Sequence, residues 1–184
     1  MSRIDIFNHE YGINPLKPYA SRIFNCSVAG ANTIGHLADG RLPRDTWLAV
    51  VMEFMYFYIA LTKGHVLKDL TEDRRDTVTS ELVNVLFPQV VDYIFDPATK
   101  AHGRALKKKY VAMAFARLEI YEGYRLLMAA TEDELQGTGL GSLCESVADL
   151  SEHPGNTLFE ETCYSHIHKS MAFLRIKSFV ASVA

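Results

Sequence analysis

A nearly uninterrupted apolar run lies between Thr46 and Leu61 and reads TWLAVVMEFMYFYIAL. Its only charged residue is Glu53, near the middle of the run. A helix on the surface of a soluble domain keeps a polar face toward water, whereas a helix that is apolar all round is covered by its neighbours. The pattern therefore predicts a central helix over about residues 44–63, with a carboxylate held inside the protein.

A second long helix is predicted over about residues 97–130, because Asp96-Pro97 supplies a cap followed by proline at the first helical position. Its apolar residues form two stripes at helical spacing, and together these stripes cover most of the circumference. One stripe holds Met113, Ala116, Ile120, Tyr124 and Leu127, and the other holds Val111, Phe115, Leu118 and Leu126. We therefore expect the helices over 44–63 and 97–130 to be the central pair.

The rest of the chain predicts further helices and no strand alternation of useful length. Helices are expected over 21–37, from Thr71 onward, over 143–150, and from Thr157 to near the C-terminus. Pro88 should kink or split the second of these. The glycine-rich segment 131–142 is expected to be a flexible connection. The fold class that follows is an all-α, single-domain bundle of five or six helices.

The first twenty positions contain Gly12, Pro15 and Pro18, which disfavour a helix. Residues 1–20 are accordingly predicted to form an extended N-terminal arm, and residues 21–184 a single α-helical domain. A chain of 184 residues is long enough for one such domain to bury a substantial core.

Charge and cysteine content narrow the expected partners and cellular location of the protein. The formal net charge of -3 gives no general attraction for nucleic acid or for anionic lipid, so neither is expected as a partner. The three cysteines are widely spaced and odd in number, which favours a reducing, cytoplasmic location over a disulfide framework. The apolar run around Glu53 is shorter than the roughly 20 residues that a membrane-spanning helix needs, and no membrane partner is predicted.

Glu53 is the first candidate for chemistry, because a buried carboxylate is costly unless it is paired, hydrogen-bonded or protonated. One interpretation is a metal ligand or a general acid/base with a raised pKa. The other, which we favour, is an ion pair with Arg117 or Arg125 across the two central helices.

Glu119 and Glu122 lie three positions apart on one predicted helix, so they occupy neighbouring positions of one face. With Glu53 they could converge on a metal ion, as carboxylates do in dinuclear iron and manganese bundles. Those bundles also use Glu-x-x-His, which this chain does not contain. Cys163 and His166 could similarly share a face toward zinc, but the sequence offers no Cys-x-x-Cys pair to complete such a site.

Function is less constrained by the sequence than the fold is. No catalytic motif is visible and no cofactor is indicated, so enzymatic activity stays undecided. The excess of apolar helix surface favours a protein that acts by protein–protein interaction or self-association, with a two-fold homodimer as the expected form. Two alternatives stay open: a metal-dependent helical-bundle enzyme using Glu53, Glu119 and Glu122, and a helical protein that binds a small ligand between its aromatic-rich helices.

Overall fold

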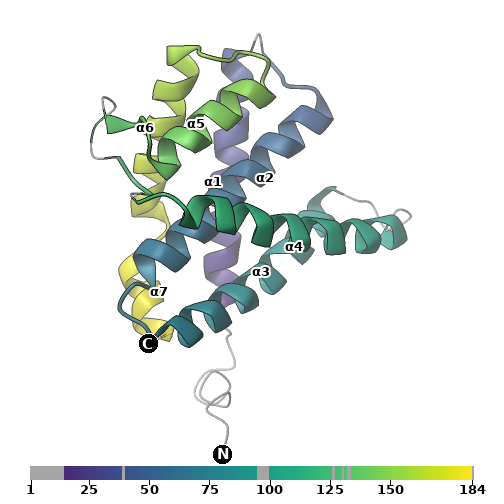
Figure 1. The fold of residues 1–184 in the computed structure, drawn as a ribbon. Coiled ribbons are helices and arrows are strands. Elements are labelled where there is room, and N and C mark those ends of the chain that lie inside the picture. The colour runs from purple at the N-terminus through teal and green to yellow at the C-terminus, as the bar shows by residue number, and fades with distance from the viewer. Residues whose placement is uncertain are drawn as a thin grey trace, which may run out of the picture.

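The protein is an all-α bundle in the computed structural model, which describes residues 15–38, 40–94, 100–125, 127–129, 131 and 134–183. These residues contain seven α-helices, one π-helical turn and no strand (Figure 1). The elements are α1 (Leu16–Leu37), α2 (Arg44–Leu61), η2 (Thr62–Val66), α3 (Glu72–Ile94), α4 (Lys100–Glu122), α5 (Gly139–Leu150), α6 (Thr157–Phe173) and α7 (Ile176–Val183). The predicted fold class is confirmed, with more helices than the five or six expected.

The helix α1 begins at Leu16 and not at Ser21, so residues 16–20 belong to the helix and not to an extended arm. Pro15 precedes the helix and Pro18 lies in its first turn. Proline is tolerated there because the first N–H groups of a helix have no acceptor within it. Residues 1–14 of the predicted arm lie outside the described residues.

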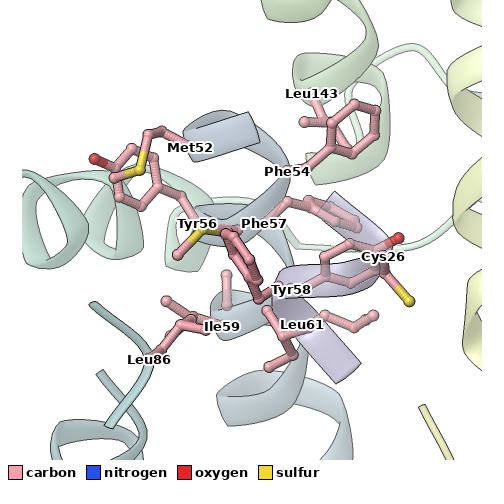
Figure 2. Packing of buried hydrophobic residues seen from close by; sticks show 14 of the residues in the cluster. Cys26, Met52, Phe54, Tyr56, Phe57, Tyr58, Ile59, Leu61, Leu86 and Leu143 are labelled. Atoms are coloured by element: carbon pink, nitrogen blue, oxygen red, sulfur yellow. The ribbon is translucent and has the colours of Figure 1, made fainter. Parts of the chain in front are cut away.

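The helix α2 forms the centre of the bundle, as the apolar run predicts. Every residue from Val50 to Leu61 is buried, including Glu53. The helices α1, α3, α4 and α5 all contact it. Figure 2 shows side chains of α2 fanning out in several directions, with Phe54 beside Leu143 of α5 and Ile59 beside Leu86 of α3. A helix apolar on all sides is thus covered on all sides.

The prediction that residues 97–130 form the second central helix is wrong in two respects. The helix α4 ends at Glu122, where Gly123 follows, and the described residues beyond it are irregular as far as Thr138. It also lies at the side of the bundle, across α2 and against α3 (Figure 1). Only Ala114, Leu118 and Tyr121 of its described side chains are buried.

Residues from both predicted apolar stripes of α4 therefore face outward: Met113, Phe115 and Ile120 keep 42%, 41% and 47% of their surface exposed. The place beside α2 that the sequence assigned to α4 is taken largely by α1, which contacts α2, α3 and α6. Small residues of α1, among them Ala20, Gly30 and Ala31, let the helices approach closely.

The loop before α5 and the first turn of that helix are held by defined hydrogen bonds and close contacts. The Thr138 side chain caps α5 by accepting a hydrogen bond from the Gly141 backbone N–H at 3.0 Å. A side chain at Gly141 would collide with the backbone carbonyl of Leu135. Leu140 N–H also donates to the Leu127 carbonyl at 2.8 Å. This part of the expected flexible connection is therefore packed against the bundle.

Two helical boundaries differ from the expectation. Pro88 does not split α3, which continues to Ile94 although the proline nitrogen cannot donate a hydrogen bond. The last predicted helix is instead divided into α6 and α7 at Arg175, whose backbone φ of 49° lies in the left-handed region and interrupts the helix.

Within the described residues, the segment Arg44–Gly64 is long and apolar enough to cross a membrane by length and composition. Of the apolar window in that segment, 72% is buried inside the bundle. Such burial is the environment of a core helix in a soluble protein.

Candidate functional site

Glu53 is held by two side chains from α4. Nη2 of Arg117 lies 3.2 Å from Glu53 Oε2, and the Tyr121 hydroxyl donates a hydrogen bond to Glu53 Oε1 at 2.8 Å. Arg117 and Tyr121 are separated by four positions, so both point from one face of α4 toward α2. The favoured interpretation of Glu53 as an ion-paired carboxylate is confirmed, with Arg117 as the partner. Arg125 lies beyond the end of α4 and is exposed.

The burial of Glu53 has a larger effect on its pKa than its two polar partners have. Only 3% of the Glu53 surface is exposed, and burial raises the pKa of its carboxyl although Tyr121 and Arg117 both favour the ionised form. The Arg117 side chain keeps 35% of its surface exposed, so the cation of the pair stays in contact with water. Glu53 is consequently a carboxyl group that can hold a proton more readily than an ordinary glutamate.

A cavity of about 350 Å³ lies beside this pair, between α2, α4 and the end of α5. Its apolar wall is formed by aliphatic and thioether side chains: Leu48, Ala49, Met52, Met113 and Leu150. Its polar lining combines two carboxylates, two cations and two phenols: Asp45, Glu53, Lys109, Arg117, Tyr56 and Tyr110. A concave, largely apolar space with a few converging polar groups is the usual form of a small-molecule site.

Tyr56 gives the cavity an unused polar group. Only 2% of its surface is exposed, and its hydroxyl has no hydrogen-bond partner among the described residues. Burial, followed by the negative charge of Glu53, raises the pKa of Tyr56, so the hydroxyl stays protonated. In Figure 2 the Tyr56 ring lies beside Met52, and its oxygen points away from the other labelled core side chains. A buried hydroxyl without a partner is costly and is therefore expected to have one in the working state.

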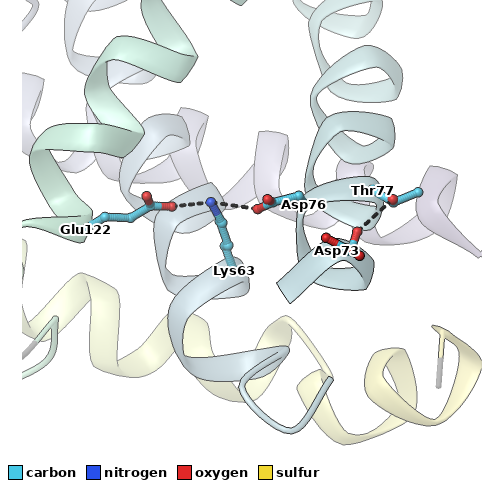
Figure 3. A network of polar contacts seen from close by, with 5 residues as sticks. All are labelled: Lys63, Asp73, Asp76, Thr77 and Glu122. Atoms are coloured by element: carbon cyan, nitrogen blue, oxygen red, sulfur yellow. Dashed lines mark hydrogen bonds and ion pairs between the residues drawn. The ribbon is translucent and has the colours of Figure 1, made fainter. Parts of the chain in front are cut away.

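The other two glutamates of the metal hypothesis do not join Glu53. Glu122 is paired instead with Lys63, at 2.5 Å, and Lys63 also contacts Asp76 at 2.9 Å (Figure 3). Burial opposes the charge on Lys63, but these two carboxylates raise its pKa above its ordinary value. Glu119 is exposed on α4. Among the described residues, no group of three or more His, Cys, Asp and Glu side chains is arranged to hold a metal ion.

The structure also gives no support to the hypothesis that Cys163 and His166 share a zinc ion. Cys163 is fully buried beside Cys144, and both burial and that neighbour raise the pKa of the Cys163 thiol. The ring Nε2 of His166 is 2.9 Å from the Cys26 carbonyl oxygen and 3.3 Å from the Ser170 hydroxyl. Burial lowers the pKa of His166, which favours the neutral ring. These two side chains are thus occupied by separate structural contacts.

A second hollow of about 380 Å³ lies between α1 and α6, and His166 and Ser170 line it. Its His166 ring and Ser170 hydroxyl already contact each other, and His166 also contacts the Cys26 carbonyl, whereas the Tyr56 hydroxyl at the first cavity has no partner among the described residues. The cavity beside Glu53 is therefore the better candidate for a ligand site.

Sequence reasoning identified Glu53 and Arg117 but missed the partners that complete the site. The sequence alone did not single out Tyr121, Tyr56 or Lys109. The available signal was spacing: Lys109, Met113 and Arg117 recur every four residues on α4 and so line one face toward Glu53.

The comparisons with known proteins found no match to this chain, whether to a protein-family model, to a curated protein or to a solved structure.

Proposed function

We propose that this protein binds a small organic molecule in the cavity between α2, α4 and the end of α5. The observation that carries the proposal is Tyr56, a residue that lines the cavity, is 2% exposed and has a hydroxyl with no partner among the described residues. A ligand atom that accepts or donates a hydrogen bond there would remove the cost of this orphan group.

The surroundings support the same function. The wall of the cavity is mostly apolar, which favours burial of a hydrocarbon or aromatic body. The Glu53–Arg117 pair supplies charge at one fixed place, and fixed polar groups in an apolar space give a ligand its orientation. Met52 and Met113 are adaptable side chains that can adjust to different shapes.

The test uses the full chain and asks whether the cavity is occupied. Native mass spectrometry of freshly purified protein should reveal a co-purifying small molecule, or thermal-shift screening of organic acids, amines and alcohols should find a stabilising one. Ala49→Leu, which adds volume to the cavity wall, should remove either signal. The proposal fails if neither method finds a ligand, or if the cavity-filling variant retains the ligand unchanged.

Tyr56→Phe and Tyr58→Phe form a matched pair of variants for the same test. Both hydroxyls are buried on α2, but only Tyr56 lines this cavity. Removing the unpartnered Tyr56 hydroxyl should stabilise the ligand-free protein by about 1 kcal/mol. Only Tyr56→Phe should also weaken ligand binding.

A second candidate function is self-association as a homodimer through α4. The observation that favours it is the exposure of Met113, Phe115 and Ile120 on a helix that projects from the side of the bundle (Figure 1). Sedimentation analysis should show a dimer that Phe115→Lys dissociates. A concentration-independent monomer would remove this candidate. A cytoplasmic location is proposed with both functions, because the three cysteines are buried and unpaired.

A further inference from the structure

We infer that the ligand of this cavity is an organic anion with an apolar body, of the class represented by a medium-chain carboxylate. This inference rests on the proposed function and adds the chemical class of the ligand to it. It follows from which polar groups around the cavity are already used, and which have donors left to offer.

The groups with unused capacity are hydrogen-bond donors. The Tyr56 hydroxyl has no partner in the described part of the chain. Arg117 contacts Glu53 through one terminal nitrogen, and a guanidinium carries five N–H donors in a planar fork suited to carboxylates. The Lys109 ammonium lies one turn before Met113 on the same helix and is exposed. A carboxylate placed between these groups would accept charge-assisted hydrogen bonds.

The acceptors of the cavity offer less to a cationic ligand. Both oxygens of Glu53 are engaged, Oε1 by the Tyr121 hydroxyl and Oε2 by Arg117. An ammonium group would have to share the Glu53 carboxylate with the Arg117 guanidinium, and two cations at one carboxylate repel each other. The remaining carboxylate, Asp45, lies in the first turn of α2 and is exposed, so water competes for it.

The apolar wall of the cavity determines the chemical character of the part of the ligand that is not charged. Leu48, Ala49 and Met52 from α2 face Met113 from α4 across the cavity, with Leu150 at the end of α5. This wall presents only carbon and sulfur to a ligand, so it matches an alkyl or aromatic body. A purely inorganic anion would leave this surface wet and unused.

Glu53 adds a dependence on pH. An anion bound to Arg117 would lie close to the Glu53 carboxylate, and the two negative charges would repel each other. Uptake of one proton by Glu53 removes the repulsion, leaves the Tyr121 contact possible and frees Arg117 for the ligand. Binding of an anion that stays ionised should therefore strengthen as the pH falls toward the acid side.

The experiment compares octanoate, octylammonium and octanol on the full-length protein by isothermal titration calorimetry. Octanoate should bind at least about tenfold more tightly than the other two, the ratio expected when one charge-assisted contact distinguishes them. Lys109→Met should reduce this preference, and Lys108→Met is the matched control, because Lys108 is also exposed but does not line the cavity. A titration with octanesulfonate, which stays ionised, should show affinity falling as the pH rises.

The outcomes separate the two proposals. Preferred binding of octylammonium or octanol, abolished by Ala49→Leu, overturns the anion inference and leaves the ligand site intact. Equal effects of Lys109→Met and Lys108→Met also overturn it, as does an affinity for octanesulfonate that is the same at every pH. Absence of binding by all three probes, together with an empty cavity in native mass spectrometry, overturns both proposals.

Discussion

The guanidinium of Arg117 on α4 reaches the middle of α2, where its Nη2 lies 3.2 Å from Glu53 Oε2. Beside this pair, the Tyr121 ring of α4 packs edge-on against Phe57 of α2 and its hydroxyl donates to Glu53. One partner of the ion pair is almost fully buried and the other is partly exposed. The pair therefore joins a buried acid to a cation that water can still reach, and its behaviour should depend on pH.

We expect Glu53→Gln to change the pH dependence of stability. Burial raises the Glu53 pKa above its ordinary value of 4.5, so between these two values the folded state binds more protons than the unfolded state. The free energy of unfolding should then fall as the pH rises from about 4.5 through the raised pKa, and level off above it. The variant lacks this fall, so its stability relative to the original protein should increase with pH across the window.

Urea denaturation at several pH values measures this difference. Near neutral pH the loss in Glu53→Gln should stay within about 1–2 kcal/mol, because the Arg117 left behind is partly hydrated. Glu119→Gln is the control, since Glu119 is an exposed glutamate of α4. Parallel stability curves for the original protein and Glu53→Gln would show that Glu53 has no raised pKa.

Arg117→Met should destabilise the protein in the opposite pH pattern. It leaves the Glu53 carboxylate buried with only Tyr121 as a partner, which should cost about 1–3 kcal/mol near neutral pH. The cost should shrink in acid, because a protonated Glu53 no longer needs a cation. Thermal unfolding followed by circular dichroism, with Lys108→Met as the control, checks this. An equal loss at both pH values would indicate a packing effect and not a charge effect.

Two glycines of α1 should respond differently to alanine. A Cβ at Gly30 would lie 2.9 Å from His166 Nε2 and 2.9 Å from Phe54 Cε2, so Gly30→Ala should cost about 1–3 kcal/mol. At Gly35 the nearest atom would be 3.6 Å away, an ordinary contact. Gly35→Ala should therefore be neutral or stabilise by up to about 1 kcal/mol through helix propensity. Chemical denaturation measures the free energy of unfolding of both variants. Equal effects would contradict the close approach of α1 and α6.

The three cysteines should react only when the protein opens. All three are buried, and burial raises the pKa of the Cys26 and Cys163 thiols, which lowers the fraction of reactive thiolate. Alkylation by iodoacetamide at neutral pH should be slow in the native protein and complete in urea. Peptide mass spectrometry after timed labelling follows each site. Rapid native labelling of Cys163 would contradict its complete burial.

How far the sequence predicts this fold depends on the helix considered. The apolar run of α2 has to be buried on all sides, because it has no polar face to turn toward water. Glu53 within this run could therefore only be paired or protonated. For α4 the same reasoning overestimates burial. Met113, Phe115 and Ile120 fit an apolar stripe as well as Ala114 and Leu118 do, yet only the latter two are buried. Spacing defines faces of a helix, and the neighbours decide which face is covered.

Only part of the candidate site could be predicted from the sequence, because its composition depends on where α4 ends. Arg117 and Arg125 were both possible partners of Glu53, and the end of α4 at Glu122 decides between them. Gly123, directly after Glu122, was a sequence signal for that end. Tyr56 could not be recognised in advance, because a tyrosine with a satisfied hydroxyl and one without a partner look the same in a sequence.

The position of α2 at the centre of the bundle makes the domain indivisible. The four α-helices that contact it, α1, α3, α4 and α5, are drawn from residues 16–150. A fragment lacking any of them would expose a strip of α2 to water and would tend to aggregate. Halves of this protein should therefore be insoluble when expressed separately and should recover only when mixed during refolding. For the same reason, the whole chain should unfold as one cooperative unit.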